Sequence, residues 1–384
     1  MGASRASGRD RPGPRADAAS MSPSRLSPSL SWALAVSTCH RGEALAECIG
    51  LALRQSRPPV GIVVVDAGDD WEANRDRVAA LVRPSGLDLQ YQHAATKSLT
   101  MQRNQAIALV SADIVFLIDD DSFMYEDCAA EILAVYEGDE AGTIAAVGAC
   151  GVEESPTART RDFSLKVTGH ARGGLGAAFA RSAAGRFVYR HVLMMGYEQT
   201  FVPYDSVSFP PLALPAGVSP DDAVPVRSIS GFALTVRADI ARREPFDPSL
   251  RHYAALEDAD FCHRIARHGA LVLARRARLH HFQISAGRLP RDTVITLQLL
   301  NLAFFLKRHS SMLAVKRAQY RRLLLRRLVA ELAKDLLSRR FALPQLRGVL
   351  RAAALQRTIF TAPADEIVAR YPEIQLRIIE QHGA

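Results

Sequence analysis

The sequence predicts an α/β fold: a doubly wound, mainly parallel sheet followed by a helical C-terminal extension. Short apolar runs alternate with amphipathic segments through the first half of the chain. An uninterrupted apolar run is typical of a strand buried on both faces, and strands that alternate with helices form right-handed crossovers between parallel strands. From Arg291 onward the pattern is helical throughout. These observations place the sheet first and the helices after it.

The individual elements follow from these runs and from the polar turns between them. Strands are predicted at residues 32–37, 61–66, 87–91, 114–118 and 144–147, and helices at 43–54, 78–82, 100–110 and 127–137. Strand character returns at 226–236, a helix opens at Leu256 and a further strand starts at Ala270. The stretch from 151 to 226 predicts a loop-rich insertion, of the kind that forms a lid over a substrate.

Composition divides the 384 residues into three regions. Residues 1–30 are rich in Ser, Arg, Pro, Gly and Ala, which predicts a disordered leader, and either Met1 or Met21 could be the start. Residues 31–285 form the predicted α/β domain, and residues 286–384 form a basic, amphipathic helical region.

The formal net charge of +8 indicates an anionic partner such as a nucleotide or a phospholipid surface. No nucleic-acid-binding motif accompanies this charge, so nucleic-acid binding is not predicted. The five cysteines lack metal-binding spacing and indicate reduced thiols in a cytosolic protein. No run reaches ~18 consecutive apolar residues and no signal-peptide core is present, so we expect no transmembrane helix and a cytoplasmic location.

A cluster of three carboxylates, Asp119, Asp120 and Asp121, directly follows the apolar run at 114–118. Open α/β sheets bind ligands at the carboxyl ends of their strands, which is where this cluster should lie. Adjacent negative charges repel one another unless they share a cation, and a hard divalent metal that also binds a diphosphate would serve. A solvated acidic turn is the alternative, and it is favoured for such a triplet in isolation.

Further polar motifs stand in a fixed order around this cluster. They are Val36-Ser-Thr-Cys-His-Arg41, Val64-Val-Asp66, Arg103-Asn104, Glu257-Asp258-Ala-Asp260 and His280-His281. Together with the Asp cluster, this ordered set resembles the family 2 glycosyltransferases, which have the nucleotide-diphospho-sugar transferase (GT-A) fold. The resemblance covers about residues 31–285 and turns the interpretation of the cluster from a solvated turn to a DxD motif.

The resemblance implies a role for each matching residue. Donor and nucleotide binding would fall to Thr38, Arg41, Asp66, Arg103, Asn104, Asp119, Gly231 and Glu257. In this assignment Asp66 hydrogen-bonds the nucleobase, Asp119 acts near the ribose, and Gly231 allows close approach of the donor sugar. Asp120 is then only a neighbour whose side chain points away.

The resemblance also implies the metal ligands and the catalyst. Asp121 would bind Mn²⁺ or Mg²⁺ together with one of His280 and His281, and the strand-end pattern favours His281. Asp258 would act as the general base, with a pKa raised by partial burial beside its acidic neighbours. The implied reaction is an inverting, metal-dependent transfer from a nucleotide-diphospho-sugar to a hydroxyl of a sugar or a lipid-linked acceptor. Association with the family suggests cell-envelope polysaccharide or glycolipid synthesis.

Two departures from the family pattern concern the nucleotide. The first loop contains Cys39-His40 where the family usually has an aromatic residue and Asn, and Asp66-Ala-Gly-Asp69 replaces the usual motif after the second strand. The donor sugar, the nucleobase and the acceptor are therefore not predicted. Two alternatives remain open: a nucleotidyltransferase of a similar fold, and a non-catalytic sugar-nucleotide-binding protein.

The C-terminal region contains a basic amphipathic helix. Apolar residues recur every four positions at Tyr320, Leu324, Leu328, Leu332 and Leu336, and arginines crowd the remaining face. Such a helix either lies on an anionic membrane or packs on its own domain with a solvated basic face. The sequence leaves both interpretations open.

Overall fold

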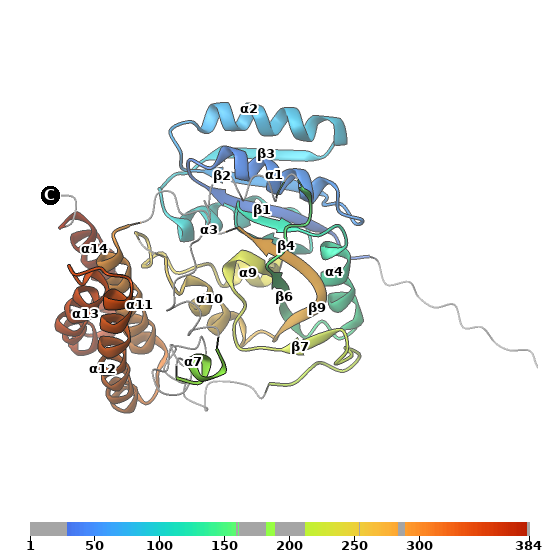
Figure 1. The fold of residues 1–384 in the computed structure, drawn as a ribbon. Helices are drawn as coiled ribbons and strands as arrows, with labels where there is room; N and C mark the ends of the chain where they lie inside the picture. Colours follow the sequence, from blue (N-terminus) through green and yellow to red (C-terminus); the bar gives the residue numbers. More distant parts are fainter. Residues whose placement is uncertain are drawn as a thin grey trace, which may run out of the picture.

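The computed structural model describes residues 29–158, 160, 182–188, 212–252, 254–282 and 289–381. The predicted leader, apart from residues 29 and 30, and most of the predicted insertion lie outside these residues. Figure 1 shows the arrangement: a sheet flanked by helices, with a bundle of helices to one side.

The sheet domain alternates strands with helices along much of its length. In chain order its elements are β1 (Trp32–Thr38), α1 (Gly42–Leu53), β2 (Gly61–Asp66), α2 (Trp71–Val82), β3 (Asp88–His93), α3 (Leu99–Leu109), β4 (Ile114–Leu117), β5 (Ser122–Met124), α4 (Cys128–Gly138), β6 (Ile144–Val152), α7 (Ala183–Phe187), β7 (Ala223–Pro225), β8 (Leu234–Arg237), α9 (Ala238–Arg243), α10 (Glu257–Ile265) and β9 (Ala270–His281). Most lie close to the predicted bounds, although α2 begins earlier and β9 runs much further than predicted.

The strand order is β3-β2-β1-β4-β8-β6-β9-β5, with β7 paired to β9. Strands β1 to β4 are parallel, as predicted, because a helix connects each to the next. The second half mixes directions: β8 is antiparallel to both β4 and β6, while β6 and β9 are parallel. In the described part of the chain, β8 follows β7 and a short 3₁₀ helix at Gly231–Ala233.

The register brings the polar motifs to one edge of the sheet. Thr38, the last residue of β1, pairs with Asp66, the last residue of β2. The Asp cluster follows β4, which is the other neighbour of β1. At the far side, Ser122 at the start of β5 pairs with His281 at the end of β9. This last pairing places His281 beside the Asp cluster, about 160 residues away along the chain.

Two apolar clusters cover the two faces of the sheet. Along β1, Trp32, Leu34 and Val36 belong to one cluster, and Ala33 and Ala35 belong to the other. This is the period of two expected for a strand buried on both faces.

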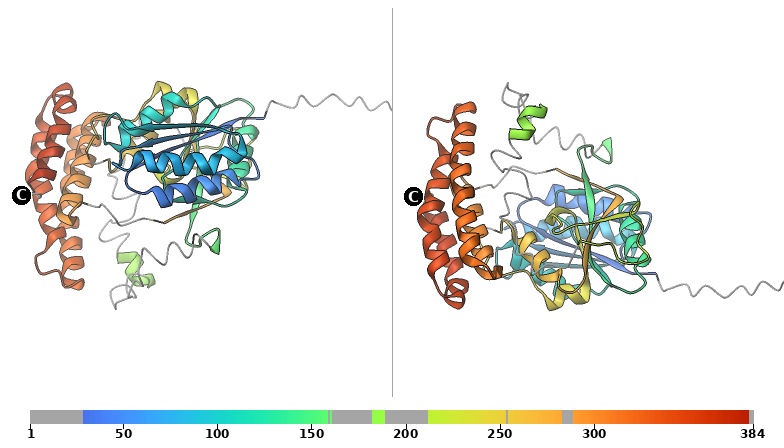
Figure 2. Two further views of the ribbon diagram at one scale, coloured as in Figure 1. Left: turned by 90° about the horizontal axis from the view of Figure 1, so that it is seen from above. Right: turned by 90° about the horizontal axis from the view of Figure 1, so that it is seen from below.

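A third apolar cluster holds the C-terminal helices together. These are α11 (Arg291–His309), α12 (Leu313–Leu337), α13 (Pro344–Thr361) and α14 (Ala364–Glu380). The cluster also includes Leu250, in the loop before α10, and Ala259, in the first turn of α10. The helical extension therefore packs against the segment that carries the Glu257-Asp258 motif, and Figure 2 shows the bundle along that side. No helix in the described part of the chain is both long and apolar enough to cross a membrane.

Candidate active site

Asp119, Asp121 and His281 form a group that could hold a metal ion. One donor atom from each of the three residues lies within 4.8 Å of the others. The His281 Nε2 atom lies 3.3 Å from Asp121 Oδ1 and 3.9 Å from Asp119 Oδ2. Two carboxylates and an imidazole are suitable ligands for a divalent cation such as Mn²⁺. Asp119, predicted to act near the ribose and the metal-bound water, thus also lies within reach of a metal.

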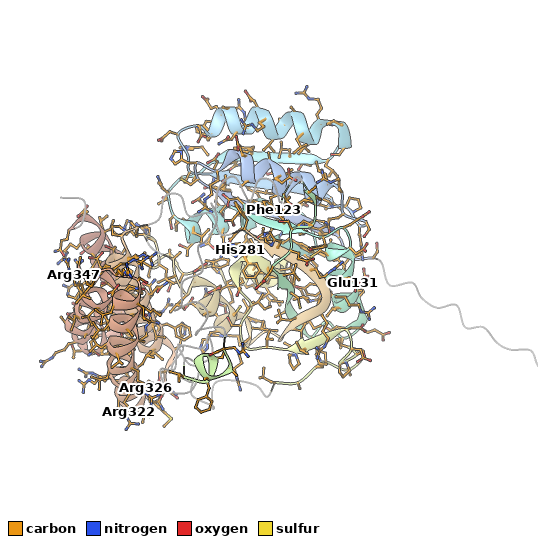
Figure 3. The ribbon with its side chains drawn as sticks, viewed as in Figure 1. Phe123, Glu131, His281, Arg322, Arg326 and Arg347 are labelled. Atoms are coloured by element: carbon orange, nitrogen blue, oxygen red, sulfur yellow. The ribbon has the colours of Figure 1, made fainter. Side chains whose placement is uncertain are left out.

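The two neighbouring histidines face different surroundings. The His281 ring stacks on Phe232, with ring centres 4.6 Å apart, and this contact fixes its orientation. The Nδ1 atom of His280 lies 3.0 Å from the Val152 carbonyl oxygen instead. Strand alternation explains the difference, because successive side chains point to opposite faces. Phe123 of β5 pairs with His280 and stacks on its ring, and Figure 3 labels both Phe123 and His281 in the sheet domain.

Asp120 turns to the loop that follows β1. The Thr38 hydroxyl donates to Asp120 Oδ2 at 2.6 Å, and Arg41 Nη1 donates to Asp120 Oδ1 at 3.1 Å. Burial raises the pKa of Asp120 to about 7, although Arg41 and Thr38 oppose this rise. Asp120, predicted to be only a neighbour, is thus a buried partner of the two predicted nucleotide-binding residues Thr38 and Arg41.

Arg103 connects the Asp cluster to the acidic motif of α10. Its Nη2 atom donates to Asp119 Oδ1 at 2.8 Å, and its Nη1 atom donates to Glu257 Oε1 at 3.2 Å. The guanidinium also donates to the Gly231 carbonyl at 3.4 Å and lies 5.1 Å from the centre of the Phe246 ring. Arg103 is buried, so these partners hold it in one place.

Asp258 and Glu257 are adjacent carboxylates in different surroundings. Asp258 accepts hydrogen bonds from the backbone N–H groups of Gly231 at 3.1 Å and Ala259 at 2.8 Å. Burial raises the pKa of Asp258, and these two donors oppose the rise. Burial and then the charge of Asp258 raise the pKa of Glu257, while Arg103 lowers it. A buried carboxylate with a raised pKa is a common feature of a general base.

Asp66 organises the turn after β2. It is not exposed, and it accepts hydrogen bonds from the Gly68 N–H at 2.7 Å, the Tyr91 hydroxyl at 2.7 Å and the Asn74 amide at 3.3 Å. In this structure its carboxylate supports the loop rather than presenting an oxygen to a ligand. The predicted contact with the nucleobase remains a prediction.

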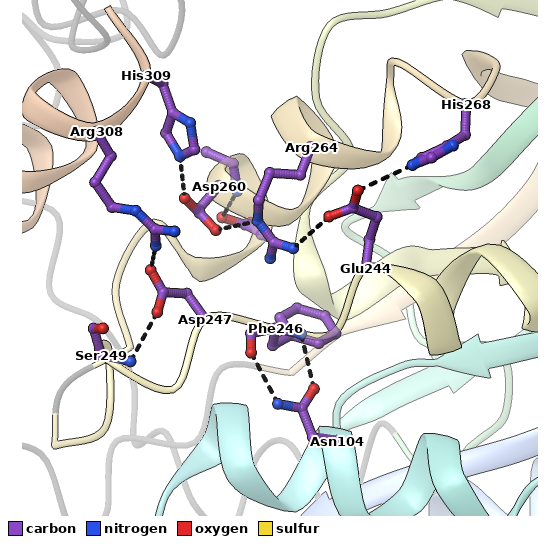
Figure 4. Close-up of polar contacts among 12 residues, drawn as sticks. Asn104, Glu244, Phe246, Asp247, Ser249, Asp260, Arg264, His268, Arg308 and His309 are labelled. Atoms are coloured by element: carbon purple, nitrogen blue, oxygen red, sulfur yellow. Dashed lines mark hydrogen bonds and ion pairs between the residues drawn. The ribbon is translucent and has the colours of Figure 1, made fainter. Parts of the chain in front are cut away.

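Asn104 points to the loop before α10. Its Nδ2 donates to the Phe246 carbonyl and its Oδ1 accepts from the Phe246 N–H, both at 2.8 Å (Figure 4). Phe246 in turn stacks on Phe261 of α10, with ring centres 4.1 Å apart. The amide of Asn104 is thus occupied by backbone in this structure, and its predicted contact with the nucleotide remains a prediction.

Sequence reasoning missed several residues that support the site. Besides Asp120, Arg308 forms an ion pair with Asp247, and His309 Nε2 lies 2.6 Å from Asp260 Oδ1 (Figure 4). Both basic residues belong to the end of α11, in a stretch for which the sequence predicts only a helix. No local pattern links them to α10, because the contacts depend on how the helices pack.

Comparison with known proteins identifies the family. A family model described as "Glycosyl transferase family 2" matches residues 34–195, which include β1, the Asp cluster and β6. Residues 34–195 are therefore similar to the family 2 glycosyltransferases. This match confirms the family predicted from the ordered motifs, and with the strand order it confirms the predicted GT-A fold. No curated protein sequence matched the chain.

Several solved structures are similar to the chain at low sequence identity. PcManGT, a mannosyltransferase from Pyrobaculum calidifontis in complex with GDP-Man and Mn²⁺, is 14% identical with a TM-score of 0.43, over 90% of this chain and 81% of that one. S. aureus TarS 1-349 is 11% identical with a TM-score of 0.45, over 92% and 91%. GalNAc-T7 with UDP, GalNAc and Mn²⁺ is 13% identical with a TM-score of 0.42, over 66% of this chain and only 44% of that one.

Proposed function

We propose that this chain is an inverting, metal-dependent glycosyltransferase that moves a sugar from a nucleotide-diphospho-sugar to an acceptor hydroxyl. One observation carries the proposal: Arg103 joins Asp119 of the candidate metal group to Glu257, and Gly231 joins Arg103 to Asp258. A candidate leaving-group site and a candidate base are therefore held by one set of buried contacts, as a displacement reaction requires.

Asp258 is proposed as the base. The acceptor oxygen attacks the anomeric carbon while the bond from that carbon to the diphosphate oxygen breaks on the opposite face, which inverts the configuration. Asp258 takes the proton of the acceptor hydroxyl. The Gly231 and Ala259 N–H groups favour its ionised form, so it can accept that proton, and burial makes it a stronger base than a free aspartate.

Asp119, Asp121 and His281 are proposed to hold Mn²⁺ or Mg²⁺. The convergence of their donor atoms supports this assignment. A cation bound there would neutralise the negative charge that grows on the departing diphosphate. The guanidinium of Arg103 adds a fixed positive charge beside Asp119.

The loop after β1 and the turn after β2 are proposed to bind the nucleotide. Thr38 and Arg41 are fixed by Asp120, and Asp66 is fixed by Tyr91 and Gly68. Rigid loops at the carboxyl edge of a parallel sheet are the usual place for such a ligand. Asn104 contributes here by holding Phe246 against the Arg103 guanidinium. The space beside Gly231, predicted to admit the donor sugar, is filled by Arg103, so Gly231 is proposed to act through its backbone contacts with Arg103 and Asp258.

A panel of UDP-, GDP- and dTDP-sugars with Mn²⁺ or Mg²⁺ tests the reaction class. Slow release of the nucleoside diphosphate supports the transferase. Exchange of pyrophosphate into a sugar nucleotide would favour the nucleotidyltransferase instead. A rise in melting temperature with a donor, together with no turnover for any acceptor tried, would favour the non-catalytic binding protein.

We further propose that the protein contacts the cytoplasmic face of an anionic membrane through α12, where it would meet a lipid-linked acceptor of envelope polysaccharide or glycolipid synthesis. The support comes from which side chains of α12 are exposed. Both acidic residues of the helix, Glu331 and Asp335, are fully buried. Glu331 pairs with Arg327 at 2.9 Å, and Asp335 accepts from backbone N–H groups at the start of α13.

The exposed face of α12 and of the following turn therefore carries positive charges only. Its exposed basic residues are Arg321, Arg322, Arg326 and Arg339. Its exposed large apolar residues are Val315, Leu325, Val329, Leu336, Leu337 and Phe341. Of the predicted apolar repeat, Tyr320 and Leu324 are buried and Leu336 is exposed. Leu323, outside that repeat, is also buried. Arginines beside exposed leucines suit a lipid surface with anionic headgroups, at ~1 kcal/mol for each basic residue near the surface. A second copy of the same basic face would be repelled.

Sedimentation with lipid vesicles tests this surface. We expect the protein to bind vesicles that contain phosphatidylserine and not vesicles of phosphatidylcholine alone, and we expect added salt to weaken binding. Replacing Arg322 and Arg326, which project from α12 in Figure 3, by Glu should abolish binding. Replacing Arg77 and Arg83 by Glu, on the distant side of the sheet, changes the net charge equally and should not. Equal loss in both double variants would contradict the proposal.

A further inference from the structure

The backbone immediately before the Glu257-Asp258 motif is left-handed. Leu256 has a φ of 73°. A leucine rarely adopts this conformation, because its Cβ atom crowds the neighbouring carbonyl. Such a residue persists only where its surroundings hold it, and it often marks a functional site. The conformation of Leu256 sets the direction in which α10 starts, and hence the position of the Asp258 carboxylate.

The helical extension holds this turn in place. The Asn301 side chain, on α11, donates from Nδ2 to the carbonyl oxygen of Ala255 at 2.8 Å. Asn301 is only 1% exposed, so this contact lies in the protein interior. Leu256 itself packs against the apolar cluster of the helical extension.

Two residues of α14 fix Asn301 in turn. The Tyr371 hydroxyl donates to Asn301 Oδ1 at 2.5 Å, and Gln375 Nε2 donates to the same atom at 3.0 Å. Gln375 also accepts from the backbone N–H of His252 at 3.1 Å, in the segment that leads to the turn. The orientation of the Asn301 amide is therefore determined, and its NH₂ group must face Ala255.

The other contacts between α11 and this segment act further from Asp258. His309 lies against Asp260, and Arg308 pairs with Asp247, which also accepts from the Ser249 N–H at 2.8 Å (Figure 4). These contacts attach the end of α11 to α10 and to the loop before it. Asn301 differs from them because it binds the residue next to the strained position.

We propose that Asn301 is a positioning residue for the reaction. Through Ala255 it keeps Leu256 left-handed, and so keeps the Asp258 carboxylate beside the Gly231 N–H. The helical extension then helps to position the Asp258 carboxylate. This inference rests on the proposed function, since it assigns Asn301 a role only through Asp258.

Two near-isosteric variants separate positioning from simple stability. Asn301→Asp keeps an acceptor for Tyr371 and Gln375 but removes the donor to Ala255. Tyr371→Phe removes a hydrogen bond in the same network and leaves the bond to Ala255 intact. We expect Asn301→Asp to lower kcat about 10-fold or more, with the Kd for nucleoside diphosphate and Mn²⁺ changed less than twofold. We expect Tyr371→Phe to lower the melting temperature and leave kcat within about twofold of the unmodified chain. An equal fall in kcat for both variants would overturn the proposal.

A glycine at position 256 provides the rescue. Glycine adopts the left-handed conformation without strain. Adding Leu256→Gly to Asn301→Asp should therefore recover part of the lost kcat, even though the lost packing of Leu256 lowers the melting temperature further. If the double variant had a lower kcat as well as a lower melting temperature than Asn301→Asp, the proposal would be overturned.

Hydrogen exchange tests the turn without any turnover. If the unmodified chain transfers no sugar from any donor in the panel, the proposed function fails, and the structural part of the inference is still measurable. The amides of residues 257–260 should exchange faster in Asn301→Asp than in Tyr371→Phe. Equal exchange in the two variants would overturn the structural part as well.

Discussion

A single added methyl group at Gly231 should disturb both the Arg103 contacts beside the candidate metal group and the contact with the candidate base, Asp258. The Gly231 N–H donates to Asp258, and its carbonyl accepts from Arg103. A Cβ atom on Gly231 would lie 2.9 Å from Nη2 and 3.1 Å from Nη1 of Arg103. Arg103 cannot simply move aside, because Asp119 and Glu257 hold its two nitrogens and it is only 3% exposed. Gly231→Ala must therefore lengthen at least one of these contacts.

The cost follows from overpacking of a buried ion pair. Forcing an extra carbon into a packed interior typically costs ~1–3 kcal/mol. If the same displacement is felt in the transition state, turnover should fall by about 10- to 100-fold. Unfolding in urea measures the free energy of unfolding, and release of nucleoside diphosphate measures kcat and KM.

Gly50→Ala provides the matched control. Gly50 lies within α1, where an added Cβ would meet its nearest atom, Arg54 Nη1, at 3.5 Å, an ordinary contact. Alanine is favoured over glycine inside a helix, so this variant should be more stable by up to ~1 kcal/mol and fully active. If Gly231→Ala kept the stability and turnover of this control, the reasoning about Arg103 would be wrong.

Three further predictions concern the metal, the turn after β2 and the base. Asp121→Asn should remove the rise in melting temperature that Mn²⁺ gives the unmodified chain, whereas an unchanged rise would refute the metal assignment. Tyr91→Phe removes the hydrogen bond to Asp66 and should cost ~1.5–3 kcal/mol of unfolding free energy and weaken nucleotide binding; unchanged UDP and GDP affinities would argue against a base pocket there. Because burial raises the pKa of Asp258 and the base must be ionised, kcat/KM should fall as the pH drops through a value above the ~3.9 of a free aspartate. A pH–rate profile without an acidic limb above that value would contradict the assignment.

The strands and the polar motifs at their ends could be predicted because both are local. The apolar run before Asp119 predicts a buried strand, and parallel strands bring their carboxyl ends to one edge of a sheet. Thr38, Asp66 and the Asp cluster are therefore expected at the same edge, which is where the structure has them. The choice of His281 over His280 also rested on a local strand-end pattern, and the metal group contains His281.

The supporting contacts could not be predicted, since they join residues far apart in the sequence. Nothing near Asn301 indicates that its amide meets Ala255, and nothing near Asp120 indicates that it accepts from Thr38. The exposed face of α12 could not be fully assigned for a related reason. Periodicity shows that a helix has two faces, but the burial of Glu331 beside Arg327 depends on the neighbouring helices.

The most direct test of the central claim is the turnover of Asp258→Asn beside its affinity for nucleotide. The asparagine keeps the shape of the side chain but cannot take a proton. The account predicts a fall in kcat of at least ~10²-fold, with the Kd values for UDP or GDP and Mn²⁺ changed less than twofold. A variant that turns over normally, or one that loses nucleotide affinity in the same proportion as kcat, would contradict the assignment of Asp258 as the base.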